Sequence, residues 1–266
     1  MPPPQNRRWP VPERLPRTPS FRLDGRRALV TGAGRGIGLA LAAALAEAGA
    51  SVTLVARSEH EIADGAAAIR AAGGQAGHAV LDVSNLAAVA AFFETRAPFD
   101  VMVNNAGTNR PKPVWDVTEA DYDAVLDLNL KSAFFVAQAA ARGMVAAGVR
   151  GSLIHIGSQM GHVGGPNRTL YCASKWALEG MSKAMALDLA PHGIRSNTIA
   201  PTFIETPMTK PFFEDATFLA SVLAKIKLGR IGTVEDLMGA ALFLACDASA
   251  LVTGTSLVVD GGWTAE

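Results

Sequence analysis

Tyr171 and Lys175 are the residues whose types and spacing most clearly indicate chemistry. They lie four residues apart in the segment YCASK, so on a helix their side chains share one face, one turn apart. An adjacent ammonium group favours the phenolate form of a tyrosine, whose ordinary pKa near 10 makes it a poor acid or base at neutral pH. Ser158, at the expected end of a strand, would hold a carbonyl oxygen by a hydrogen bond while Tyr171 exchanges a proton with it.

Asn129 would complete this group by anchoring a chain of water molecules behind Lys175. Taken singly, each residue also has an ordinary structural explanation. Tyr171 could be a core aromatic residue and Lys175 a solvated helix residue. Ser158 could cap a strand end, and Asn129 could belong to a turn. Taken together, the four residues predict proton transfer at an oxygen while hydride moves to or from the adjoining carbon.

A glycine-rich turn provides the expected cofactor site. The segment TGAGRGIG at 31–38 precedes an alanine-rich stretch, and Gly32, Gly36 and Gly38 would permit a tight turn and close approach to a pyrophosphate. Free amides at the helix N-terminus would bind phosphate oxygens. The spacing is G-x-x-x-G-x-G, because Ile37 stands where the third glycine of G-x-G-x-x-G would fall. A tight connection that binds no ligand is the structural alternative.

The end of the second expected strand indicates which dinucleotide is bound. NAD sites usually have a carboxylate there, but this chain has Ala56 followed by Arg57. A cation suits the 2'-phosphate of NADP, and Arg35 would add a second positive charge, so we predict NADP(H) over NAD(H). Either arginine could instead be a solvated surface residue. Asp82, expected to close the third strand, would accept a hydrogen bond from adenine or cap the next helix.

From Phe21 onward, short apolar runs alternate with alanine-rich stretches, which is typical of parallel strands covered by crossover helices. Seven runs are predicted strands of one sheet: RALVTG, SVTLVA, HAVLDV, DVMVNNAG, GSLIHIGS, IRSNTIAP and SLVVDGG. Helices are predicted at 36–49, 58–73, 119–147, 168–192 and 233–246. We therefore predict an α/β fold, a doubly wound, Rossmann-like parallel sheet with helices on both faces. Ligands bind beyond the carboxyl ends of such strands.

Composition excludes several other classes of protein. The 266 residues are 49% hydrophobic and 18% charged, which excludes a disordered or fibrous protein. Basic and acidic residues number 24 each, so the field that nucleic acid or an anionic membrane would need is missing. The apolar stretch from Ile37 is interrupted at Glu47, far short of the roughly 18 residues of a spanning helix. The cysteine and histidine pattern predicts no disulfide framework and no metal, and favours a cytoplasmic setting.

The N-terminal residues differ in composition from the rest. Residues 1–20 contain seven of the fifteen prolines, with no apolar segment followed by a small-residue cleavage site. We expect them to form a disordered, proline-rich surface tail ahead of a single catalytic domain at 21–266. A docking arm or an organellar address is the alternative.

In combination, the motifs resemble the short-chain dehydrogenase/reductase family. The glycine turn, NNAG at 104–107, Asn129, Ser158 and YCASK occur in this order, and the resemblance covers about residues 21–266. It implies a catalytic tetrad: Asn129, Ser158, Tyr171 and Lys175. Within it, Tyr171 would be the acid/base and Lys175 would also bind the nicotinamide ribose. The length fits the short, single-domain branch of the family.

These arguments together assign cofactor binding to a set of residues: Gly32, Arg35, Gly36, Ile37, Gly38, Arg57, Asp82, Val83, Asn105, Ala106, Gly107, Tyr171, Lys175, Pro201, Thr202, Ile204 and Thr206. The chain departs from the family pattern after the sixth strand, where members often have Pro-Gly and this chain has Pro201 followed by Thr202. Thr202 would hydrogen-bond the nicotinamide carboxamide or line the pocket. Thr206 resembles the residue that often contacts the carboxamide.

Two segments are expected to contact the substrate. Residues 203–228, where the family places its substrate lid, include Phe203 and three further phenylalanines. They would close over the substrate and exclude water, although a helix packed on the body or on another subunit would have the same composition. The loop after Ser158 would bring four polar residues near the site: Gln159, His162, Asn167 and Arg168. These groups favour a hydroxylated substrate, although they could equally be ordinary loop residues.

The sequence therefore predicts an NAD(P)-dependent oxidoreductase that interconverts a secondary alcohol and a ketone on a sugar, sugar acid or polyol. A reductase of 3-oxoacyl thioesters or cyclic ketones is the alternative. An alternative of another class is a catalytically silent nucleotide-sensing or scaffold protein. We expect the run SLVVDGGW to be an edge strand, and the family resemblance implies a homotetramer. Neither nucleic acid nor a membrane is expected as a partner.

Overall fold

The apolar runs form one parallel sheet within residues 15–265, which the computed structural model describes. The strands are β1 (Arg27–Thr31), β2 (Ser51–Ala56), β3 (Gln75–Val80), β4 (Val101–Asn104), β5 (Ser152–Ile156), β6 (Arg195–Pro201) and β7 (Ser256–Val259). Their order is β3-β2-β1-β4-β5-β6-β7, so β7 is an edge strand as expected. The order reverses between β1 and β4, which places a ligand crevice beyond the carboxyl ends of these strands.

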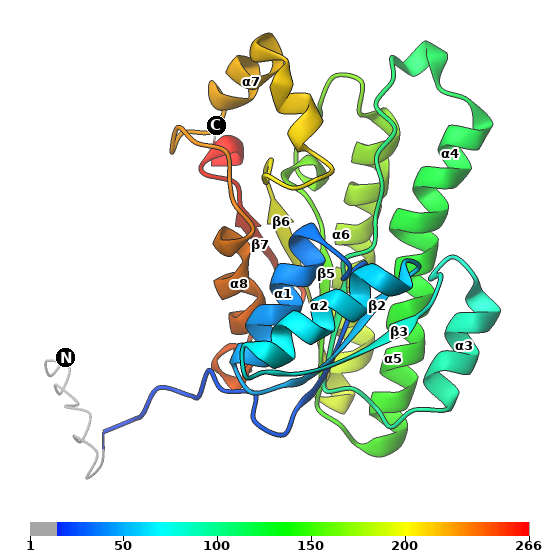
Figure 1. Ribbon diagram of the computed structural model, residues 1–266, viewed down its shortest axis with the longest axis vertical. Helices are drawn as coiled ribbons and strands as arrows, with labels where there is room; N and C mark the ends of the chain where they lie inside the picture. Colours follow the sequence, from blue (N-terminus) through cyan, green and yellow to red (C-terminus); the bar gives the residue numbers. More distant parts are fainter. Residues whose placement is uncertain (1–14, 266) are drawn as a thin grey trace, which may run out of the picture.

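Helices cover both faces of the sheet (Figure 1). They are α1 (Gly36–Glu47), α2 (Glu59–Ala71), α3 (Leu86–Glu94), α4 (Glu119–Leu126), α5 (Ala133–Ala147), α6 (Thr169–Leu189), α7 (Ala216–Leu223) and α8 (Glu235–Ala245). Residues of α1, α2 and α8 share one hydrophobic core cluster, whereas residues of α3 and α5 belong to a second. The doubly wound α/β fold in a single domain is thus confirmed.

Successive residues of β1 are buried on opposite faces of the sheet. Ala28 and Val30 belong to the cluster beneath α1 and α8, while Leu29 is buried with Val136 and Met144 of α5. Because strand side chains alternate between faces, a strand covered by helices on both sides is apolar at every position. This double burial explains the largely apolar runs of β1 and β4 in the sequence.

The third strand is shifted from its predicted position. The run HAVLDV predicts a strand at 78–83, but β3 spans Gln75–Val80 and pairs with β2 along its whole length. Its side chains are largely exposed at the sheet edge, so its hydrophobic pattern is weak. Leu81 and Val83 are buried in the second cluster beyond the strand end, and this burial is the reason for their apolar character.

The helices also differ from expectation in two ways. The segment 119–147 is interrupted by a π-helical turn at Asp127–Ser132, which separates α4 from α5. The sequence patterns did not predict α3, and they gave a helix only as the alternative for the segment 203–228 that contains α7. Both are short, with nine and eight residues, and helical periodicity becomes distinctive only over about 10–12 residues.

Packing of the body begins near Leu23, which is 2% exposed and donates its backbone N–H to the carbonyl oxygen of Ala48 at 2.8 Å. Residues 15–20 are exposed and belong to no helix or strand. Most of the predicted tail at 1–20 lies outside the described residues, so its extent stays a prediction. Among residues 15–265, no helix is both long and apolar enough to cross a membrane.

Candidate active site

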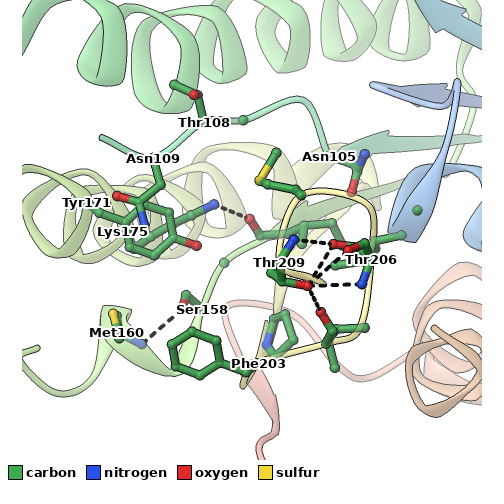
Figure 2. A pocket seen from close by; sticks show the side chains of 18 of the residues that line it. Asn105, Thr108, Asn109, Ser158, Met160, Tyr171, Lys175, Phe203, Thr206 and Thr209 are labelled. Carbon is green, nitrogen blue, oxygen red and sulfur yellow. Dashed lines mark hydrogen bonds between the residues drawn. The ribbon is translucent and has the colours of Figure 1, made fainter. Parts of the chain in front are cut away.

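A cavity of about 340 Å³ opens beyond the carboxyl ends of the central strands, and Figure 2 shows part of its lining. Ser158 follows β5, while Tyr171 and Lys175 belong to the first turns of α6, and all three line the cavity. The structure therefore brings together three of the four residues predicted to be catalytic. Their roles stay predictions until they are tested in solution.

Lys175 is buried in the wall of the cavity. The residue is 6% exposed, and its ammonium group donates a hydrogen bond to the carbonyl oxygen of Ile156 at 2.7 Å. Burial lowers the pKa of Lys175 to about 8, while the Glu179 carboxylate acts in the opposite direction. The ammonium nitrogen lies 5.5 Å from the centre of the Tyr171 ring, so the two side chains share one face of α6 as their spacing predicts.

Tyr171 holds its proton more firmly than the sequence suggests. Burial raises the pKa of its phenol, and this effect outweighs the lowering by a hydrogen bond to Ser158 and by the charge of Arg168. The expectation that the neighbouring ammonium group depresses this pKa is thus wrong for the chain alone, because desolvation of the phenolate dominates. At neutral pH, Tyr171 is a neutral phenol that can donate a proton.

The Ser158 hydroxyl group is held from two sides. It donates a hydrogen bond to Oε1 of Gln159 at 2.7 Å. It accepts one from the backbone N–H of Met160 at 3.1 Å (Figure 2). The Met160 contact fixes the position of the oxygen atom. Rotation about the C–O bond would redirect the proton from Gln159 to a substrate oxygen.

Asn129 lies behind the cavity and does not belong to its lining. It is 2% exposed, and its Oδ1 accepts a hydrogen bond from the backbone N–H of Thr108 at 2.8 Å. Its Nδ2 donates to the carbonyl oxygen of Thr108 at 2.9 Å and to the hydroxyl of Ser174 at 3.0 Å. These bonds tie the loop after β4 to α6, so Asn129 positions the cavity wall. The water chain behind Lys175 stays a prediction.

The predicted cofactor residues fall into two groups. Most of them line the cavity: Gly32, Arg35, Gly36, Ile37, Asn105, Ala106, Gly107, Tyr171, Lys175, Pro201, Thr202, Ile204 and Thr206. The others do not: Gly38, Arg57, Asp82 and Val83. Apart from Gly38, these outlying residues follow β2 and β3, where the adenosine half of a dinucleotide is expected.

The glycine turn has the backbone that its sequence predicts. Gly32 and Gly36 have φ angles of 61° and 57°, in the left-handed region that favours glycine. A Cβ atom at Gly38 would overlap the carbonyl oxygen of Gly32 and the side-chain amide of Asn105. That amide holds the turn by donating to the carbonyl oxygens of Thr31 and Gly32, both at 3.0 Å. The first turn of α1 has no acidic residue and no side-chain cap, so its free amides suit a phosphate.

Two buried polar atoms of the lining have no hydrogen-bond partner in the described residues: Oγ1 of Thr202 and Oδ1 of Asn109. Buried polar groups normally find a partner, so these atoms indicate that the cavity receives a polar ligand. The glycine turn, the open helix N-terminus and the Thr202 hydroxyl together fit a nicotinamide dinucleotide.

The two arginines predicted to bind the 2'-phosphate lie in different surroundings. Arg35 is exposed and forms an ion pair with Glu61, with 3.0 Å between the two side chains. Arg57 is exposed and makes no hydrogen bond or ion pair within residues 15–265. A phosphate group would therefore compete with Glu61 for Arg35, whereas Arg57 is available.

Asp82 lies two residues beyond β3 and is held locally. One of its oxygens accepts hydrogen bonds from the backbone N–H and the hydroxyl of Ser84, at 2.9 and 2.7 Å. These bonds lower the pKa of Asp82, and the charge of Arg57 contributes less. Asn85 caps α3 by accepting a hydrogen bond from the N–H of Ala88 at 3.1 Å, so the alternative role of Asp82 as the helix cap is wrong. Contact with adenine stays a prediction.

The structure separates the predicted substrate residues. Gln159 and Phe203 line the cavity, but His162 does not. The His162 ring instead contacts the hydroxyl of Ser256 at 2.9 Å and lies 3.7 Å from the Glu179 carboxylate. These partners on β7 and α6 hold the ring outside the cavity lining, and its contact with the substrate stays a prediction.

Sequence reasoning gave no individual role to several residues of the lining: Thr108, Asn109, Met160, Met208 and Thr209. Asn109 lies just after NNAG, so the search beyond strand ends could have found it. Met208 and Thr209 belong to the segment predicted as a lid, whose role stays a prediction. Within residues 15–265, no group of three or more His, Cys, Asp or Glu side chains could hold a metal ion.

Comparison with known proteins identifies relatives of nearly the same length. The sequence model of a family described as Enoyl-(Acyl carrier protein) reductase matches residues 32–264. L-xylulose reductase from Bos taurus is 38% identical over 92% of this chain and 99% of that protein. Gluconate 5-dehydrogenase from Gluconobacter oxydans (strain 621H) is 40% identical over 92% of this chain and 96% of that protein.

Solved structures agree with these sequence relatives. The crystal structure of a gluconate 5-dehydrogenase from Burkholderia cenocepacia J2315 in complex with NADP and tartrate has a TM-score of 0.89 and 44% identity. That match covers 92% of this chain and 98% of the other. The residues that the family model matches include all those that line the cavity described above. The chain therefore belongs to the short-chain dehydrogenase/reductase family and is an NAD(P)-dependent oxidoreductase.

Proposed function

We propose that the enzyme interconverts a secondary hydroxyl group and a ketone on a sugar, sugar acid or polyol, with NADP(H) as its cofactor. The observation that carries the proposal is the shared cavity, in which Ser158, Tyr171 and Lys175 lie with the glycine turn and an unpartnered Asn109 oxygen. Polar atoms of this kind suit a hydroxylated substrate. The relatives named L-xylulose reductase and gluconate 5-dehydrogenase support the same substrate class.

In the direction of reduction, the bound nicotinamide would supply hydride to the carbonyl carbon. Tyr171, a neutral phenol in its buried position, donates its proton to the carbonyl oxygen. Ser158 turns its hydroxyl from Gln159 to that oxygen and stabilises the developing charge by a hydrogen bond. The Lys175 ammonium, 5.5 Å from the Tyr171 ring, stabilises the phenolate that remains.

The test of this mechanism is Tyr171→Phe, assayed with NADPH and a panel of ketoses and keto sugar acids. General acid–base catalysis contributes about 100- to 10,000-fold, so the variant should lose at least about 100-fold in kcat while its Kd for NADPH changes little. Tyr122→Phe is the matched control, because Tyr122 is the other tyrosine of the chain and is exposed on α4. Retention of more than about a tenth of wild-type kcat, with chemistry rate-limiting, would contradict the assignment of Tyr171 as the acid.

The preference for NADP(H) is proposed from Arg57, which follows β2 and makes no hydrogen bond or ion pair within the described residues. Charge-assisted hydrogen bonds contribute about 1.5–3 kcal/mol, so Arg57→Ala should weaken NADP binding about 10- to 100-fold and hardly affect NAD. Arg35→Ala should have the smaller effect, because Glu61 already engages Arg35. Ala56→Asp added to Arg57→Ala should shift preference further towards NAD.

The measurement for this cofactor prediction is the ratio of kcat/KM with NADPH to kcat/KM with NADH. The relative from Burkholderia cenocepacia, whose solved structure holds NADP, supports the expected preference. Arg57 would be excluded as the phosphate-binding residue if Arg57→Ala lowered kcat/KM equally with NADPH and NADH. A preference of the wild-type enzyme for NADH would exclude it too.

We propose that the enzyme assembles as a homotetramer and that it works in the cytoplasm. Large apolar side chains are exposed on α5 and α6, including Phe134, Trp176 and Leu187, and a second copy of the chain would bury them. Both cysteines, Cys172 and Cys246, are free, which suits a reducing compartment. Light scattering after size-exclusion chromatography measures the mass, and a monomer at micromolar concentration would contradict the proposed assembly.

A further inference from the structure

Arg168 is a buried cation without a partner anion. It immediately precedes α6, three residues before Tyr171, and is 7% exposed. Within residues 15–265 its guanidinium group makes no hydrogen bond or ion pair, and it lies 5.6 Å from the centre of the Phe212 ring. Arginine stays protonated, and buried charges in proteins are almost never left unpaired. The guanidinium nitrogens are not among the sealed atoms without a partner, so they face the cavity and can receive an anion that the described chain does not provide.

The unpaired guanidinium lines the catalytic cavity. Arg35 and Lys175 are the other cationic residues of the lining, and both already have partners, namely the Glu61 carboxylate and the carbonyl oxygen of Ile156. In the described part of the chain, no Asp or Glu side chain contributes to the lining. The cavity thus offers an incoming anion an attractive site at Arg168 and no repelling carboxylate.

We propose that Arg168 binds the carboxylate of the substrate, so that the enzyme acts on sugar acids in preference to uncharged sugars and polyols. This inference rests on the proposed function and narrows its substrate class. The guanidinium group presents a planar fork of N–H donors that matches the two oxygens of a carboxylate. An uncharged sugar would leave the buried cation unpaired, which is the costlier arrangement.

The placement of Arg168 beside Tyr171 suits an acid with hydroxyl groups along a short carbon chain. Residues three apart at a helix start are neighbours, with Cβ atoms about 5–6 Å apart, so one substrate can reach both side chains. The unpartnered Oδ1 of Asn109 belongs to the same lining, and Figure 2 shows Asn109 on the Tyr171 side of the cavity. It can accept a hydrogen bond from a substrate hydroxyl, which a simple fatty acid could not supply.

The test compares 5-keto-D-gluconate with L-sorbose, two ketones that differ in having a carboxylate or a hydroxymethyl group at one end. The wild-type enzyme, assayed with NADPH, should have the higher kcat/KM for the keto acid. In Arg168→Met the ratio of the two kcat/KM values should fall about 10- to 100-fold, mainly through the KM of the keto acid. Arg168→Lys keeps the charge and loses the fork, so its ratio should be intermediate.

Phe212→Leu is the matched control, because it removes the ring beside the guanidinium and leaves the charge. It should keep the wild-type ratio, whatever its effect on the individual rates. If Arg168 only held Phe212 in place, Arg168→Met would lower kcat/KM for both substrates alike. The ratio of the two values would then be unchanged, and this result would overturn the inference.

A second measurement keeps the inference testable if Arg168→Met does not fold. Calorimetry on the wild-type protein with NADP+ should show D-gluconate binding at least about tenfold more tightly than sorbitol. Equal binding would overturn the role of Arg168. Reduction of L-sorbose without preference for the keto acid would overturn it too, while leaving the proposed function standing. Failure to reduce any sugar ketone with either cofactor would instead overturn the proposed function itself.

Discussion

At the scale of single residues, burial acts on Tyr171 and Lys175 in opposite directions, because the phenol is neutral when protonated and the ammonium group is charged. It raises the pKa of Tyr171 and lowers that of Lys175 to about 8, so both shifts favour the uncharged forms. Glu179 opposes the second shift with a carboxylate that is itself 6% exposed. The charge beside the Tyr171 phenol is therefore sensitive to pH just above neutrality.

The low pKa of Lys175 makes stability depend on pH. An unfolded lysine has a pKa of about 10.4, so between about pH 8 and 10 the unfolded chain binds more protons than the folded chain, and the free energy of unfolding rises with pH. The excess stability of wild type over Lys175→Met should increase by roughly 1 kcal/mol per pH unit in that window. Urea unfolding of both proteins across the window measures it. A constant difference would show that Lys175 keeps an ordinary pKa in the folded protein.

At the scale of elements, the burial of a strand decided whether its position could be predicted from the sequence. The runs of β1, β2, β4 and β5 could be found because strands covered on both faces leave largely apolar segments. The edge strand β3 could not be placed, because its exposed residues resemble a loop and the buried Leu81 and Val83 beyond it resemble a strand. The separate parts of 119–147 share one helical pattern, so the π-helical turn left no signal in it.

The same reasoning explains what the sequence could tell about the site. The spacing of Tyr171 and Lys175 directly encodes a shared helix face, and the structure has it. The direction of the His162 ring could not be predicted, because its contacts with Ser256 and Glu179 join segments far apart in sequence. The pKa of Tyr171 depends on desolvation by the whole cavity, which no local motif specifies.

The close packing of the glycine turn against the start of α1 can be tested with Gly38→Ala. The added methyl group would overlap the Gly32 carbonyl oxygen and the Asn105 amide. Overpacking costs about 1–3 kcal/mol, so Tm should fall by at least about 2 °C and the Kd for NADPH should rise. The matched control is Gly239→Ala in α8, where a Cβ meets nothing within 4 Å and helix propensity predicts a gain of up to about 1 kcal/mol. Equal Tm values for the two variants would contradict the described packing.

At the scale of the whole molecule, the sheet and its two helical layers form a body in which packing starts at Leu23. The residues just before it, 15–22, are exposed. Within a few residues, the sequence therefore passes from a segment that contributes little to stability to one that is packed into the body.

This boundary predicts different outcomes for two deletions. Removal of residues 1–20 should leave kcat unchanged and Tm within about 5 °C of wild type. Removal of residues 1–24 also deletes Leu23 and its hydrogen bond to Ala48, and loss of a buried leucine costs about 2–5 kcal/mol, so Tm should fall by about 5 °C or more. Differential scanning calorimetry compares the two. A large fall in Tm for the shorter deletion would mean that the predicted tail packs on the body or on a neighbouring subunit.

The contact between Trp263 and the proposed lid has an optical consequence. The Trp263 ring lies 5.8 Å from that of Phe203 and 5.1 Å from the Lys225 ammonium nitrogen, and the C-terminal segment lies next to α7 in Figure 1. Indole emission shifts in wavelength with the polarity around the ring, so movement of this segment changes the fluorescence of Trp263. Substituting phenylalanine at the remaining tryptophans isolates that emission: Trp9, Trp115 and Trp176. The protein thus carries its own fluorophore for testing, in a stopped-flow spectrometer and without any attached dye, whether the predicted lid closes.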